Sequence, residues 1–100
     1  LGKAPAETVI TFALCELGLR STRDGPSEGQ RFHVPMTQQQ LGDFCGLSAV
    51  HICRTLRRLE RNDVLSVTDH MDVVVHDMGA LAQIAEIDID MLRGEIIAAA

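Results

Sequence analysis

The sequence predicts a mainly α-helical domain with a small β-hairpin wing, the arrangement called a winged helix-turn-helix. Residues 37–61 have the pattern of two short helices joined by a glycine turn, and two β-branched segments follow them, as in a hairpin. A length of 100 residues suits one domain. We therefore expect a single domain over residues 1–100, with the helix-turn-helix at about 37–61, the wing at about 64–76, and a C-terminal helix and tail at 77–100.

The composition favours a globular protein that folds in water. Hydrophobic residues make up 46% of the chain and charged residues 23%. Because only three aromatic residues occur, the core should be aliphatic, and stacking of aromatic rings on single-stranded bases is not expected. No apolar run reaches the roughly 18 residues of a membrane span, and residues 1–5 do not resemble a signal peptide. We expect a cytoplasmic protein without membrane contact. Its lack of an initial methionine is compatible with a longer parent protein.

The cysteines and histidines predict neither a bridge nor a metal site. Cys15, Cys45 and Cys53 are odd in number, and their spacing matches neither a disulfide framework nor a zinc site. Cys15 and Cys45 adjoin apolar residues and are expected in the core. Cys53 is expected to be partly exposed, and a redox role is the alternative to simple packing there. The four histidines show no ligand spacing. We expect no metal and no cofactor in this chain.

The net charge of -5 argues against nucleic-acid binding, because lysines and arginines that neutralise phosphates supply most non-specific affinity. The distribution of charge weakens that objection. Residues 31–61 carry five arginines and only two acidic residues, whereas the rest of the chain is strongly acidic. Positive charge is therefore concentrated around the predicted helix-turn-helix.

The N-terminal third predicts a helix, a loop and a strand. Residues 7–17 have apolar side chains at i, i+3, i+4 and i+7, which is typical of an amphipathic helix, and Gly18 predicts its end. Residues 21–30 are rich in Ser, Gly, Asp and Pro and predict a surface loop. Residues 31–34 alternate between polar and apolar and precede Pro35, which predicts a short edge strand.

The first helix of the helix-turn-helix has a start signal and a stop signal. Thr37 and Gln40 form the pattern of a capping box, in which each side chain accepts a hydrogen bond from the other residue's backbone N–H. Leu41 and Phe44 are expected to give this helix its apolar side. Gly46 then predicts the turn.

The second helix is predicted from the cap Ser48 to about Arg61, with Asn62 as the first residue that breaks it. At 100° per residue its side chains separate into two faces. The face expected in the core contains Ile52, Leu56 and Leu59. The face expected to point outward contains Val50, Arg54, Arg57 and Arg61.

The remaining chain predicts a wing and a final helix. Residues 64–68 and 72–76 suit a hairpin whose polar tip is residues 69–71. Asp77 predicts the cap of a helix that continues to about residue 86. In the tail at 87–100, Asp90 could cap a further helix, although a glycine inside it costs about 1 kcal/mol relative to alanine.

This order of elements and three motifs resemble one family. The motifs are PMTQQQLGD at 35–43, GLS at 46–48 and RTLRRLE at 54–60, and GLSAVHICRTL is the most specific run. They resemble the C-terminal winged-helix DNA-binding domain of the Crp/Fnr family of bacterial transcription regulators, over roughly residues 8–86. The resemblance implies double-stranded DNA as the partner and a homodimeric full-length parent with an N-terminal sensory region. The parent's effector, its target genes and the sign of its regulation do not follow from it.

The resemblance also implies roles for individual residues. Thr37, Gln38 and Gln39 match a helix start on the DNA backbone, Ser48 and His51 match phosphate-facing positions, and Arg54 matches a guanine-reading arginine. Further DNA contacts are expected from Ala49, Val50, Cys53, Arg57, Arg58 and, in the wing, Thr68 and His70.

The sequence departs from the family pattern after Ser48. Many members place a polar or charged residue and then glutamate there, but this chain has Ala49 and Val50. Since Val50 cannot accept a hydrogen bond from cytosine N4, we expect contact with a thymine methyl group and a half-site of one strict guanine beside thymines. Cys53 stands where related members often have asparagine, so the polar contact usual there is not expected.

The arginines and the domain as a whole also allow interpretations other than DNA recognition. Arg57, Arg58 and Arg61 could equally form a solvated helix face or pair with Glu60 or Asp63. A winged-helix module that binds another protein is the alternative function, favoured by the net negative charge. No nucleophile, phosphate loop or acid–base pair stands out, so an enzyme is not expected.

Overall fold

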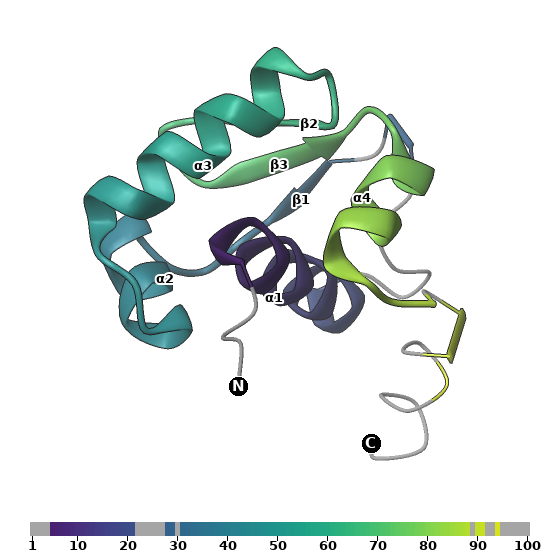
Figure 1. The fold of residues 1–100 in the computed structure, drawn as a ribbon, viewed down its shortest axis with the longest axis horizontal. Helices are drawn as coiled ribbons and strands as arrows, with labels where there is room; N and C mark the ends of the chain where they lie inside the picture. The colour runs from purple at the N-terminus through teal and green to yellow at the C-terminus, as the bar shows by residue number, and fades with distance from the viewer. Residues whose placement is uncertain (1–4, 22–27, 30, 89, 92–93, 95–100) are drawn as a thin grey trace.

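The computed structural model describes residues 5–21, 28–29, 31–88, 90–91 and 94. The described chain folds into four helices and three strands, which confirms the predicted mainly α-helical fold with a small hairpin (Figure 1). In chain order they are α1 (Ala6–Ser21), β1 (Arg31–His33), α2 (Gln38–Cys45), α3 (Ala49–Arg61), β2 (Leu65–Val67), β3 (Asp72–Val75) and α4 (Met78–Ala85). None of the helices described is both long and apolar enough to cross a membrane.

The three strands form one antiparallel sheet in the order β1-β3-β2. The predicted hairpin is β2 and β3, with Leu65 opposite Val75. The predicted edge strand is β1, which pairs with the other side of β3 and places His33 opposite Asp72. Through the pairing of β1 with β3, the chain segment that follows α1 is therefore hydrogen-bonded to the wing.

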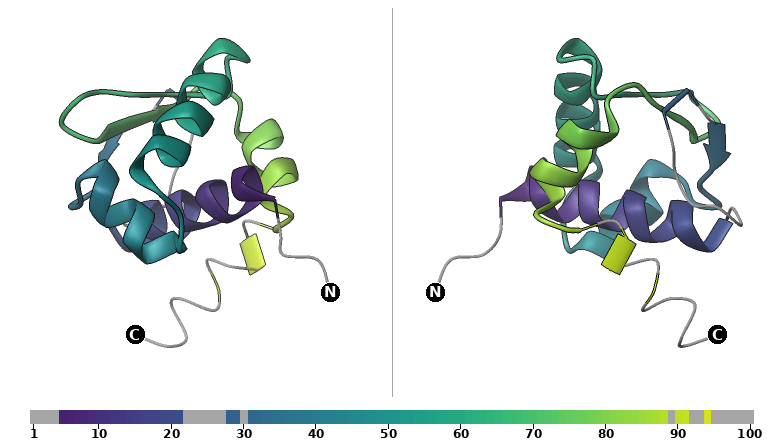
Figure 2. Two further views of the ribbon diagram at one scale, coloured as in Figure 1. Left: turned by 60° about the vertical axis from the view of Figure 1, so that its left-hand side comes forward. Right: turned by 90° about the vertical axis from the view of Figure 1, so that its right-hand side faces the viewer.

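Helix α1 lies at the centre of the packing and contacts α2, α3, α4 and β1 (Figures 1 and 2). The core between these elements is mainly aliphatic, as predicted, and Phe32 is its only aromatic side chain among the described residues. Its largest fully buried side chains are Ile10, Leu14, Leu41, Ile52, Leu56, Leu59, Leu65 and Leu81. All helices thus contribute to one core, on which the helix-turn-helix rests.

The predicted end of α1 at Gly18 is wrong, because the helix continues to Ser21. Gly18 is buried inside α1, and a Cβ atom built on it would lie 3.1 Å from Cζ of Phe32. The glycine makes room for an aromatic ring from β1. It is required by long-range packing and not by a helix C-terminus.

The wing differs from the prediction at its tip. Asp69 and His70 are exposed, as expected for a polar turn, but Met71 is buried in the core and has a φ of 62°. Its carbonyl oxygen accepts a hydrogen bond from the N–H of Val34 at 2.8 Å. The turn therefore fixes the hairpin to the segment that leads into α2.

The C-terminal helix α4 begins where it was predicted. The side chain of Asp77 accepts from the N–H of Ala80 at 3.0 Å, and Glu86 ends the helix with a φ of 57°. In the tail, the carboxylate of Asp88 accepts from the N–H groups of residues 90 and 91, at 3.0 and 3.3 Å. Most of the loop predicted at 21–30 and of the tail lies outside the described residues.

Among the described glycines, Gly42 in the helix-turn-helix has the closest neighbouring atom, which gives a first prediction. A Cβ atom on Gly42 would lie 2.5 Å from the carbonyl oxygen of Leu47. Since backbone must then shift, Gly42→Ala should lower the free energy of unfolding by about 1–3 kcal/mol, measured by urea denaturation. The control is Gly79→Ala in α4, where the new Cβ meets only ordinary contact at 3.5 Å from Asp77. Equal stability of both variants would contradict the role given to Gly42.

Candidate nucleic-acid interface

Helix α2 begins with the predicted capping box. The N–H of Gln40 donates to Oγ1 of Thr37 at 3.1 Å, and the N–H of Thr37 donates to Oε1 of Gln40 at 3.0 Å. At the other end Gly46 adopts the left-handed conformation, with a φ of 72°. The capping box fixes the start of this eight-residue helix, and Gly46 ends it. The chain then turns directly into the next helix.

Helix α3 follows after a short turn and is also capped as predicted. The hydroxyl of Ser48 accepts from the N–H of His51 at 3.1 Å. The predicted core face of Ile52, Leu56 and Leu59 is buried. Thr55 is buried as well, which the hydrophobic pattern did not indicate because threonine is polar. This buried stripe fixes the orientation of the opposite face.

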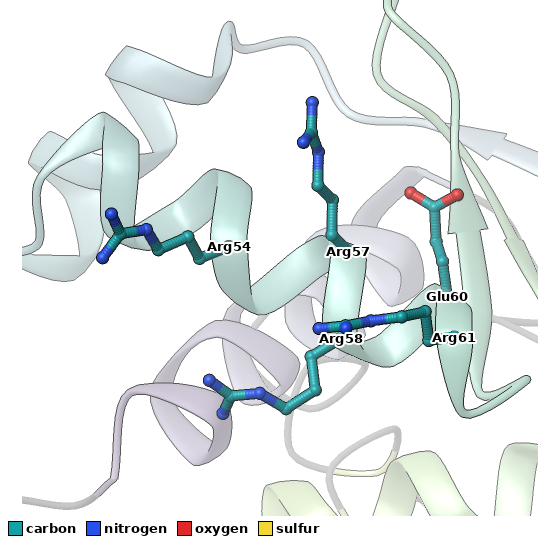
Figure 3. Close-up of a pocket in the computed structure, with 5 residues that line it drawn as sticks. All are labelled: Arg54, Arg57, Arg58, Glu60 and Arg61. Carbon is teal, nitrogen blue, oxygen red and sulfur yellow. The ribbon is translucent and has the colours of Figure 1, made fainter.

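The opposite face of α3 carries four exposed arginines, which we call the arginine face: Arg54, Arg57, Arg58 and Arg61. Together with Glu60 they line an open hollow of about 590 Å³ (Figure 3). None of the four forms a salt bridge within the described chain, so the predicted alternative of pairing with Glu60 or Asp63 is not seen. Figure 3 shows the guanidinium groups spread outward and apart. The positive charge of this face is available to an external anion.

The N-terminal turn of α3 is exposed but mostly apolar. Ala49, Val50 and His51 are all exposed, and Val50 leaves 60% of its surface in water. Val50 and Arg54 lie one helical turn apart, on the same side of α3. A ligand that contacts Arg54 would therefore also meet an apolar methyl surface.

The structure differs from the prediction in the burial of two residues of α2. Leu41 is buried, but Phe44 is 55% exposed and does not belong to the apolar side of the helix. Cys45, predicted in the core, is half-buried, whereas Cys15 is fully buried and Cys53 half-buried as expected. Burial raises the pKa of the Cys15 thiol to about 12, and it also raises the pKa of Cys45. Neither environment stabilises a reactive thiolate.

The wing tip lies beside the start of α2. Thr37 and Gln40 line one hollow of about 350 Å³ together with Asp69 and His70. Thr68 is exposed, and its hydroxyl accepts from the N–H of Asp72 at 3.1 Å, so it holds the turn of the hairpin. Asp69 was not singled out by the sequence. Its negatively charged carboxylate lines the same hollow as Thr37 and His70, which are expected to contact phosphates.

The expected contact residues thus form two groups. Thr37 and His70 share the hollow between α2 and the wing, and Arg54, Arg57 and Arg58 share the arginine face. Gln38 is half-buried and Gln39 exposed at the start of α2.

Two histidines have partners within the sheet. Nδ1 of His33 lies 3.0 Å from Oδ1 of Asp72, and Nε2 of His76 lies 2.6 Å from Oγ of Ser66. In the part of the chain that the structure describes, no three His, Cys, Asp or Glu side chains gather as metal ligands would.

The chain is similar to known bacterial regulators. The family model for the Crp-like helix-turn-helix domain matches residues 10–84. The nitrogen fixation regulation protein FixK of Azorhizobium caulinodans is 29% identical over 84 residues, which are 84% of this chain and 34% of that protein. This chain therefore spans about a third of the length of that relative.

Two solved structures share the fold. FixK2 from Bradyrhizobium japonicum aligns with a TM-score of 0.69 at 21% identity, over 84% of this chain and 40% of that one. Oxidized CprK in complex with o-chlorophenolacetic acid aligns with a TM-score of 0.61 at 21% identity, over 83% of this chain and 35% of that one.

The capping box at α2 gives a second prediction. Thr37→Ala removes the acceptor for the Gln40 N–H and should lower the free energy of unfolding by about 1 kcal/mol, measured by thermal or urea denaturation. Gln39→Ala serves as the control, because Gln39 is exposed on the same helix and alanine favours helix. If the control lost as much stability as Thr37→Ala, the capping box would not be the cause.

The burial of Cys15 gives a third prediction. Because its thiol is buried and its pKa is raised to about 12, Cys15 should resist alkylation by iodoacetamide at pH 8 in the folded protein. Mass spectrometry should find the label on Cys53 first, since that side chain is partly exposed. Labelling of Cys15 at the same rate in native and in urea-unfolded protein would contradict this packing.

Proposed function

Because this chain belongs to the family of Crp-like helix-turn-helix domains, the DNA-binding output domains of Crp/Fnr-type transcription regulators, we propose that α3 enters the major groove of double-stranded DNA and that Arg54 reads a guanine. The observation that carries the proposal is the arginine face, which is exposed and free of salt bridges within the described chain. The planar guanidinium can donate to O6 and N7 of guanine together.

Val50 and Ala49 give the proposed site its particular specificity. The exposed methyl groups of Val50, one turn before Arg54, suit contact with the C5-methyl group of thymine and offer no hydrogen bond to cytosine. Cys53 is half-buried beside Arg54 and contributes at most a weak polar contact. The expected half-site therefore combines one strict guanine with neighbouring thymines.

The remaining contacts position the domain on the backbone. The free N–H groups at the starts of α2 and α3 suit phosphate oxygens, with side-chain contacts from Thr37, Gln38, Gln39, Ser48 and His51. Arg57 and Arg58 extend the positive surface along α3. The wing offers Thr68 and His70, and the hollow shared by His70 and Thr37 supports contact with one stretch of backbone. Asp69 in that hollow should weaken the wing contact.

The parent protein is proposed to be a cytoplasmic homodimer. This chain spans about a third of its FixK relative, so most of a regulator of that length would lie outside it. Two copies of the domain would bind half-sites about one helical turn apart, and residues 1–100 are proposed to act as one domain in each copy. One isolated domain should bind weakly and lose affinity as salt rises.

A protein-binding module is the second candidate function. The net charge of -5 and the exposed Phe44 favour it. Neither candidate requires catalysis, in keeping with a family of transcription regulators.

Substitution of Arg54 gives the prediction that separates these candidates. Selection of duplexes from a random library by the full-length dimer should enrich a palindrome with one guanine in each half-site. Arg54→Ala should lower affinity for that site by about 1–3 kcal/mol per half-site, and Arg54→Lys should restore only part of it, because lysine cannot form the bidentate contact.

Two arginines serve as controls in gel-shift or fluorescence titrations. Arg57→Ala should weaken binding to all sequences alike, and Arg20→Ala on α1 should leave it unchanged. The proposal would be contradicted if the wild-type dimer enriched no sequence, or if the Arg54→Ala variant kept the sequence preference of the wild type.

A further inference from the structure

Two exposed phenylalanines flank one hollow between α1 and α2. Phe44 on α2 is 55% exposed and Phe12 on α1 is 38% exposed. Both line a hollow of about 190 Å³ together with Val9, Ala13 and Cys45. The arginine face contributes no residue to it. Large apolar side chains that gather at an exposed site often mark a surface that a partner covers.

The apolar surface continues on the other side of Phe44. Its ring also lines a hollow of about 330 Å³ with Pro35 and Met36. The ring of Phe44 therefore stands between two neighbouring depressions. We call this surface the phenylalanine groove and define it by Val9, Phe12, Pro35, Met36 and Phe44.

The rim of the groove is acidic. Glu16 lines the first hollow and Asp43 lines the second, and among the described residues no lysine or arginine lines either hollow. Asp43 forms no salt bridge with any described residue, and Glu16 reaches only Arg20, at 3.9 Å. The uncompensated charge of the rim is therefore negative.

The charge of the rim selects among possible occupants. DNA and anionic lipid headgroups would be repelled by Asp43, whereas Arg20 partly offsets the charge of Glu16. A second copy of the same groove would bring like charges together, which costs affinity. A protein segment with an apolar side chain beside a cationic group would complement both the apolar groove and its negatively charged rim.

We propose that the phenylalanine groove docks an amphipathic helix of a partner protein, with a large apolar side chain against Phe44 and a Lys or Arg beside Asp43. An extended peptide is disfavoured, because the residues that define the groove lie on α1, on α2 and in the segment before α2, and none of them belongs to a strand that could pair with it. No residue of the groove belongs to the arginine face, although Pro35, Met36 and Gln40 line both its second hollow and the hollow beside the wing tip.

Matched synthetic peptides test the proposal on the 100-residue chain. The probe is a helical peptide of about sixteen residues with Trp and Leu one turn apart and two flanking arginines. One control peptide replaces the arginines with glutamates, and a second replaces Trp and Leu with alanines. The probe should shift the amide resonances of Val9, Phe12 and Phe44 selectively, and each control peptide should bind at least about tenfold more weakly.

Variants of the chain locate the contact. Phe44→Ala should weaken the probe about tenfold and Asp43→Asn about threefold, because the anchor carries more of the binding than the exposed ion pair. Met91→Ala is the matched control, since Met91 is 67% exposed and lies outside the groove. Circular dichroism checks that each variant remains folded. Binding of a guanine-containing duplex should be the same for wild type and Phe44→Ala.

Several results would overturn the proposal. They are equal binding of the arginine and glutamate peptides, resonance shifts outside the groove, and no effect of Phe44→Ala. Concentration-dependent dimerisation of the chain that Phe44→Ala abolishes would assign the groove to a second copy. Loss of duplex binding by folded Phe44→Ala would assign it to the DNA interface. A failure of Arg54 to select a sequence would count against DNA reading and leave these outcomes unaffected.

Discussion

The arrangement of the helix-turn-helix depends on one close backbone approach, between Gly42 in α2 and Leu47 in the turn. The N–H of Leu47 donates to the carbonyl oxygen of Gly42 at 2.8 Å, and no side chain larger than hydrogen fits between the two segments. Gly46 supplies the left-handed residue that the turn needs. Because backbone contacts fix this turn, they constrain the direction of α3 in addition to the packing of its own side chains. The exposure of Arg54 follows from that direction and from the burial of Ile52, Leu56 and Leu59.

The sequence predicts features that arise from contacts between near neighbours. Thr37, Ser48 and Asp77 each accept a hydrogen bond from a backbone N–H three residues later, so their roles follow from local spacing alone. The expectations for Gly18 and Met71 are wrong because the roles of these two residues depend on residues distant in sequence. Gly18 accommodates the ring of Phe32, and Met71 turns into the core from a position that the alternation pattern assigns to a polar tip.

Phe44 shows why the faces of a short helix are hard to predict. Leu41 and Phe44 are three residues apart and therefore about 60° apart around the helix, so both fit one broad apolar side. In the structure the buried part of α2 is narrower and includes Leu41 and Gly42 but not Phe44. The spacing of apolar residues in an eight-residue helix does not show which of its side chains the neighbouring helix α1 will bury. For α3, thirteen residues define the buried stripe well enough that the arginine face could be predicted correctly.

The assignment of individual DNA contacts draws on different information from the fold. The structure shows that the arginine face is exposed and forms no salt bridge with the described residues, but a guanine contact for Arg54 comes from the family resemblance. In the wing, Thr68 holds the turn and Asp69 faces the start of α2, and neither property is visible in a hydrophobic pattern. The exposure of the arginines on α3 could therefore be predicted from the sequence, whereas the DNA contacts proposed for them rest on the family resemblance.

Net charge is a poor guide to the partners of this domain, because the domain is wider than the distance over which charges act in salt solution. Its principal extents are 34 × 34 × 23 Å, whereas the Debye length at physiological ionic strength is about 8 Å. A phosphate close to Arg54 would therefore experience the neighbouring arginines far more strongly than acidic groups elsewhere on the surface. The acidic rim beside Phe44 should likewise act locally on a cationic partner. Surfaces of opposite sign can thus serve different partners on one small domain whose total charge is negative.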